Sequence, residues 1–100
     1  MIRHIVMFKI KDFEVRGKKQ EIISQFKEQL EALSLKIPEI RFINIGLNSN
    51  DSPNGFDLVL ESEFDDIQSL DTYRVHPEHQ KVVEFIKPYK IQSASVDYEV

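Results

Sequence analysis

The sequence has 100 residues, no cysteine, and 13 basic against 17 acidic side chains, which give a formal net charge of −4 at pH 7. This balance argues against a nucleic-acid partner, and the lack of cysteine excludes disulfides, thiolate metal sites and thiol nucleophiles. No apolar run approaches the roughly 20 residues of a membrane span, so we expect no membrane partner and a single domain over residues 1–100.

The opening segment, "IRHIVMFKI" over residues 2–10, alternates between two faces and predicts a β-strand. His4 and Lys9 interrupt its apolar stretch and no small-residue cleavage site follows, so we expect a cytoplasmic protein rather than an exported one. The more apolar face of this strand carries Ile2, His4, Val6, Phe8 and Ile10.

Residues 18–35 change to helical spacing, and Pro38 is expected to end this helix because it lacks a backbone donor. A second strand is predicted over residues 40–47, followed by the turn-forming stretch "NSNDSPNG". A third strand is predicted over residues 56–64, where apolar and polar side chains alternate, and we expect it to pair antiparallel with the second.

The stretch "DDIQSLDTYRV" predicts a short helix capped by Asp65, with Gln68 three residues later in a capping-box position. A further helix is expected to begin at Pro77, which suits a first helical position, with His76 as its N-cap. The last segment, residues 92–100, alternates again and predicts a fourth strand.

This order of elements predicts an α+β protein with the ferredoxin-like split βαβ fold, a four-stranded antiparallel sheet with helices on one face. The other face is expected to be too apolar for water, and burying each such side chain is worth roughly 1.5–3 kcal/mol. We therefore expect a homodimer in which two sheets face each other as a dimeric α/β barrel. The residues expected on this open face are Ile5, Met7, Ile43 and Ile45.

Three polar aromatic side chains are candidates for chemistry, namely His4, Tyr73 and His79. Each shares an apolar face or helical stripe with core residues, so the three are expected to meet in a cleft between sheet and helices. A buried neutral imidazole can act as a general base, and a tyrosine hydroxyl can donate to a carbonyl or enolate oxygen. The alternative is that each is a core residue bonded to a backbone partner.

The third histidine, His76, is expected to cap a helix rather than to take part in catalysis. The motif "HPEH" lacks the i, i+4 histidine pair of zinc enzymes, and no carboxylate stands at a spacing that would complete a metal site. We therefore expect neither a metal nor a cofactor.

The stretches "IRHIVMFKIKD", "IPEIRFINIGLN", "FDLVLESEFDDIQSLDTYRVHPEHQKVVEFI" and "VDYEV" resemble the stress-responsive dimeric α/β-barrel (Dabb) domain family over nearly the whole chain. The resemblance implies a ferredoxin-like fold and a homodimer built from facing sheets. A polyketide cyclase branch of this family performs an aldol-type ring closure, and its catalytic positions match His4, Tyr73 and His79 here. The residues that would line the substrate site are Phe8, Phe26, Phe64, Phe85 and Tyr89.

These observations favour a homodimeric small-molecule-binding protein. The more specific hypothesis is a cofactor-free lyase or cyclase that acts on a carbonyl substrate. The alternative is a non-catalytic stress or assembly protein with structural histidines. A cofactor-free monooxygenase of similar barrel shape stays open by fold analogy alone.

Overall fold

The computed structural model describes all of residues 1–100, and its elements follow the order expected from the alternation of hydrophobic periods. They are β1 (Ile2–Ile10), α1 (Lys18–Ala32), a 3-10 turn (Leu33–Leu35), β2 (Phe42–Leu47), β3 (Leu58–Phe64), α2 (Ile67–Val75), α3 (Pro77–Ile86) and β4 (Lys90–Glu99). No helix is both long and apolar enough to span a membrane.

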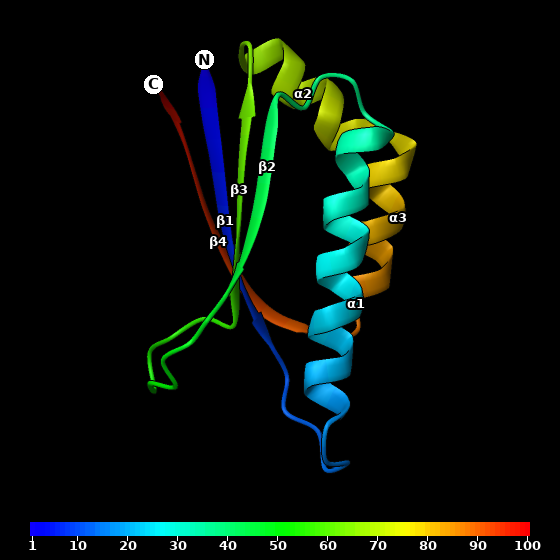
Figure 1. The fold of residues 1–100 in the computed structure, drawn as a ribbon, viewed down its shortest axis with the longest axis vertical. Helices are drawn as coiled ribbons and strands as arrows, with labels where there is room; N and C mark the ends of the chain where they lie inside the picture. Colours follow the sequence, from blue (N-terminus) through cyan, green and yellow to red (C-terminus); the bar gives the residue numbers. More distant parts are fainter.

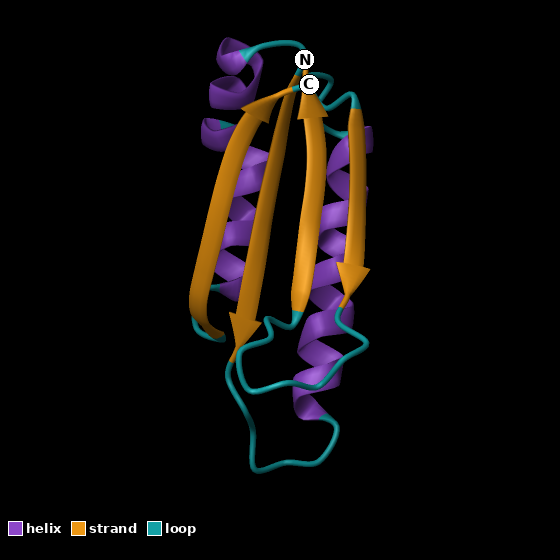
Figure 2. Ribbon diagram, turned by 90° about the vertical axis from the view of Figure 1, so that its left-hand side faces the viewer, coloured by secondary structure: helices purple, strands orange, loops and turns teal.

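The four strands form one antiparallel sheet in the order β2-β3-β1-β4. All the helices lie on one side of this sheet (Figure 1), and the other side is left open (Figure 2). The two long strands at the centre and edge, β1 and β4, bring the two chain termini together at one end of the sheet. The predicted α+β, ferredoxin-like arrangement is therefore confirmed.

The core lies between the sheet and the helices, where 15 buried hydrophobic side chains form one cluster. Phe26 from α1, Leu60 from β3 and Leu70 from α2 are each at most 2% exposed and show how both layers, the sheet and the helices, contribute to it. The register places His4 of β1 opposite Ser62 of β3 on one side and opposite Asp97 of β4 on the other. His4 thus places a polar side chain at one end of the otherwise apolar core.

The open face carries Ile5 and Met7 as expected, but the prediction that Ile43 and Ile45 also lie there is wrong. Ile45 pairs with Leu60, faces the helices, and is 6% exposed. Strand β2 is therefore one residue out of phase with the prediction, and such a shift moves every side chain of a strand to the other face of the sheet. Phe42 therefore occupies the open face, where it is 46% exposed.

The helix ends depend on local side-chain caps. The predicted cap of α2 is wrong by one residue, because Asp66 rather than Asp65 accepts a hydrogen bond from the Ser69 amide, at 2.8 Å. Asp65 instead forms an ion pair with Arg41, at 2.9 Å. The predicted cap of α3 is correct, since the Glu78 amide donates to Nδ1 of His76 at 3.1 Å.

A buried histidine and tyrosine cluster as candidate active site

Three ring side chains from three different elements meet at one end of the core. The ring centroids of His4 on β1 and Tyr73 on α2 are 6.2 Å apart, and those of Tyr73 and His79 on α3 are 4.3 Å apart. The structure therefore brings together the three candidate catalytic residues, which are separated by up to 75 positions in the chain. Below we call His4, Tyr73 and His79 the ring cluster.

The Tyr73 hydroxyl has an unusual environment. The residue is 0% exposed, and its hydroxyl oxygen is a buried polar atom without a hydrogen-bond partner. Burial raises the pKa of the phenol well above its ordinary value, and the nearby charge of Arg74 offsets this only in part. The group therefore stays protonated at neutral pH and is available as a donor. Leaving such a group unpaired costs roughly 1–3 kcal/mol.

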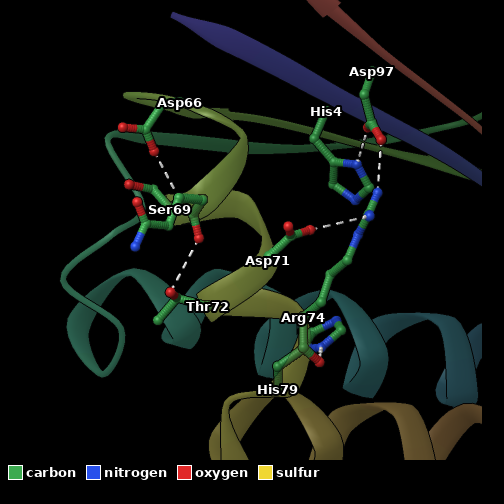
Figure 3. A network of polar contacts seen from close by, with 9 residues as sticks. His4, Asp66, Ser69, Asp71, Thr72, Arg74, His79 and Asp97 are labelled. Atoms are coloured by element: carbon green, nitrogen blue, oxygen red, sulfur yellow. Dashed lines mark hydrogen bonds and ion pairs between the residues drawn. The ribbon is translucent and has the colours of Figure 1, made fainter.

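His4 is held by a carboxylate. Its Nδ1 atom contacts Oδ1 of Asp97, and the second oxygen of Asp97 contacts Nη2 of Arg74 at 2.6 Å (Figure 3). Because a carboxylate can only accept, Nδ1 of His4 must carry the hydrogen. In the neutral ring, Nε2 is then unprotonated and free to accept.

Asp97 is ionised in this arrangement. Partial burial raises the pKa of its carboxyl, but the hydrogen bonds from His4 and Arg74 and the charge of Arg74 outweigh burial, so the net pKa is lowered. The carboxylate is thus a permanent acceptor that lies on β4, the last strand, directly beside the first strand.

His79 is held in the same tautomer by a different partner. Its Nδ1 lies 3.0 Å from the backbone oxygen of Arg74, which can only accept, so Nδ1 again carries the hydrogen. Burial is the largest cause and lowers the pKa of His79; the hydrogen bond to the backbone of Arg74 raises it by less, and the charge of Arg74 lowers it further. His79 is therefore neutral at pH 7, with Nε2 available as a base.

Sequence reasoning missed Arg74 and Asp97. Asp97 stands on the polar face of a predicted strand, and nothing in that pattern shows which residue lies opposite it. Only the register between β1 and β4 places it beside His4. Arg74 follows Tyr73 in the chain, but its importance lies in its contact with Asp97, 23 positions away.

Of the aromatic residues expected to line a substrate site, Phe64 contacts the ring cluster. Its ring centroid is 5.0 Å from that of Tyr73 and 6.5 Å from that of His4. Phe64 is 0% exposed and packs as an apolar side chain against the rings of Tyr73 and His4.

The other four expected lining residues make their ring contacts elsewhere. Phe8 and Phe26 pack against each other, with centroids 5.0 Å apart, within the sheet–helix layer. Phe85 and Tyr89 form a separate pair, 6.0 Å apart, at the end of α3. The five aromatic residues therefore do not form a single wall in this structure.

The ring cluster is closely packed. The three main hollows on the molecule, of about 290, 540 and 350 Å³, are lined by other residues, and none of these three includes His4, Tyr73 or His79. The structure also gathers no three His, Cys, Asp or Glu side chains that would hold a metal ion. The Tyr73 hydroxyl is itself buried, so a molecule that reaches it must displace packed side chains.

Comparisons with known proteins agree with this architecture. The chain is 35% identical, over 80 residues and 80% of each protein, to an uncharacterised protein of Streptomyces coelicolor. It superposes with a TM-score of 0.89 on a crystal structure from Bacteroides fragilis, described as a dimeric protein of unknown function with a ferredoxin-like fold. That protein is 39% identical, and the match covers 99% of this chain and 95% of the other.

A more distant structural neighbour is the hydroxynitrile lyase from Passiflora edulis. It has a TM-score of 0.82 at 20% identity, and the match covers 99% of this chain and 92% of the lyase. At this identity the likeness concerns the fold. The sequence profile described as Stress responsive A/B Barrel Domain (Dabb) matches residues 2–100. The chain therefore belongs to the stress-responsive A/B barrel domain family.

Proposed function

We propose that this chain is a homodimeric small-molecule-binding protein that acts as a cofactor-free lyase or cyclase on a carbonyl compound. The observation that carries the proposal is the unpaired, fully buried Tyr73 hydroxyl beside two histidines that each keep Nε2 free. Buried polar groups are almost always paired in folded proteins, so an exception marks a site where a ligand oxygen would complete the bonding.

The proposed chemistry uses the three rings in distinct roles. Nε2 of His79 removes a proton from the carbon next to a carbonyl group, and the electron pair moves onto the carbonyl oxygen, which accepts a hydrogen bond from Tyr73. The resulting enolate carbon bonds to a second carbonyl carbon of the same molecule, and the imidazolium returns its proton to the new alkoxide. In the reverse direction the same steps break a carbon–carbon bond.

His4 has a supporting role in this scheme. Its Nε2 accepts a hydrogen bond from a substrate hydroxyl, while Asp97 fixes the orientation of the ring. The hydroxynitrile lyase neighbour supports including carbon–carbon lyase assays among the tests, because a protein of the same fold carries that activity in its name.

The homodimer is proposed to form through the open face of the sheet. Met7, Val96 and Tyr98 are 39%, 55% and 41% exposed on this face, where Val59 is the strand partner of Met7 and Ile5 that of Val96. A second copy would bury this apolar surface in an interface on the order of 1,600 Å². The related protein from Bacteroides fragilis is described as dimeric.

One observation favours the alternative of a non-catalytic protein. The ring cluster is closely packed, with Tyr73 0% and His4 7% exposed, as expected if the histidines only hold helices against the sheet. A structural histidine, once removed, leaves its partners unpaired and costs roughly 1–3 kcal/mol.

Ligand-induced thermal stabilisation distinguishes a ligand-binding ring cluster from a purely structural one. The parent protein and Tyr73→Phe would be screened with β-diketones, aromatic 3,5-dioxo acids and mandelonitrile. We expect at least one compound to raise the melting temperature of the parent and to lose this effect in Tyr73→Phe. Tyr98→Phe, on the open face, serves as the matched control and should keep the response. Failure of all three compound classes to stabilise the parent would count against the proposed activity.

A further inference from the structure

We propose that Arg74 is a positioning residue that sets the hydrogen-bonding of both histidines in the ring cluster. Its guanidinium orients Asp97, which holds His4, and its backbone oxygen holds His79 directly. The catalytic consequence of this role rests on the proposed function. The contacts of Arg74 themselves belong to the substrate-free protein.

The guanidinium acts through the carboxylate of Asp97. Nη2 of Arg74 lies 2.6 Å from Oδ2, which leaves Oδ1 for the ring of His4. A second acidic residue, Asp71 on the same helix, lies 3.7 Å from Nη1 of Arg74 and restrains the guanidinium from the other side. Because Arg74 occupies one oxygen of Asp97, the carboxylate cannot rotate without breaking a charge-assisted hydrogen bond.

The polar groups around His4 come from three elements. His4 is faced by Asp97 from β4, by Tyr73 and Arg74 from α2, and by His79 from α3. Among these groups Asp97 is the anion, and Arg74 is the permanent cation bound to it.

The backbone of Arg74 serves the second histidine. Arg74 is the penultimate residue of α2, where backbone oxygens lack partners within the helix. Its oxygen accepts from Nδ1 of His79 at 3.0 Å and from the Gln80 side-chain amide at 2.6 Å. The end of α2 therefore holds the first turn of α3, and the tautomer of His79 follows from that contact.

The two links differ in one way that an experiment can use. Replacing the Arg74 side chain removes the link to His4, but it leaves the backbone oxygen that holds His79 in place. If Arg74 acts only by positioning, its replacement should therefore change the tautomer of His4 and leave that of His79 unchanged. General loosening of the α2–β4 contact should change both.

Side-chain ¹⁵N NMR of the substrate-free protein at pH 7 distinguishes the tautomers and the charged ring. In the parent we expect the hydrogen to lie on Nδ1 in both His4 and His79, as their contacts require. In Arg74→Gln we expect His4 to lose this pattern and to show a mixture of tautomers, while His79 keeps its hydrogen on Nδ1. Arg74→Lys, which retains a cation near Asp97, should restore the His4 pattern at least in part.

Arg41→Gln is the matched control, because it removes an exposed Arg–Asp ion pair that contacts no histidine. It should leave both ring patterns unchanged. An unaltered His4 in Arg74→Gln, or an equal change in both rings, would overturn the role of Arg74 while leaving the proposed function standing. A parent protein whose His79 carries its proton on Nε2 would instead contradict the proposed function itself.

Discussion

Tyr73 and His79 lie on consecutive helices with their ring centroids 4.3 Å apart, yet the Tyr73 hydroxyl has no hydrogen-bond partner. The close packing of the two rings contributes apolar contact, whereas the unpaired hydroxyl opposes folding. Such a compromise is typical of sites where a group is kept for function at a cost in stability.

Removing the hydroxyl should therefore stabilise the protein. We expect Tyr73→Phe to raise the free energy of unfolding by about 1 kcal/mol, because the variant no longer buries an unpaired polar atom. Chemical denaturation with linear extrapolation measures the change. Tyr89→Phe is the control, since Tyr89 is only half-buried, and its loss of a hydroxyl should change stability by less than about 0.5 kcal/mol. A destabilised Tyr73→Phe would mean that the hydroxyl has a partner in solution.

The lowered pKa of His79 makes stability depend on pH. The unfolded state takes up a proton near the ordinary value of 6.5 while the folded state resists it, so the unfolded state binds more protons just below pH 6.5. Stability from this group is complete above that pH and falls as the pH drops through it, by up to about 1.4 kcal/mol per pH unit.

An NMR titration of the His79 ring checks the same point directly. We expect its midpoint to lie below 6.5, and the pH dependence of unfolding between about pH 7 and 5 to become shallower in His79→Gln. A midpoint at or above 6.5 would contradict the assignment of His79 as a neutral base.

The open face of the sheet should control assembly. Ile5→Lys introduces a charge at the centre of the face, and we expect the mass measured by light scattering to fall from about twice 11.8 kDa to 11.8 kDa. Leu35→Lys is the matched control, because Leu35 is 91% exposed and lies in the 3-10 turn that follows α1, away from the open face. If Ile5→Lys keeps the mass of the parent, the facing-sheet interface is not the one used.

The cap of α2 gives a test of the corrected boundary. Asp66→Ala should lower the free energy of unfolding by about 0.5–2 kcal/mol, because the Ser69 amide loses its acceptor. Asp65→Ala removes only an exposed ion pair with Arg41 and should cost less than about 1 kcal/mol. Equal costs in the two variants, measured by thermal unfolding, would argue against Asp66 as the cap.

Local sequence patterns were sufficient for most of the elements in this protein. The alternation in residues 2–10 predicted β1 with the correct inward face, and Pro77 after His76 predicted the start of α3. Three of the candidate site residues could be placed in one region because each shares a face with core side chains. These features follow from periodicity, which acts within a single segment.

The sequence by itself determined which segments become helices and strands, because helical and extended periods are local properties of the chain. Only the tertiary structure decided that Ile45 points inward, that Asp97 lies beside His4, and that Arg74 reaches Asp97. Each of these depends on which strand pairs with which and in what register, and a shift of one residue would reverse the face of every side chain in the strand. The hydrogen-bond partner of His4 is set by that pairing between the two ends of the chain.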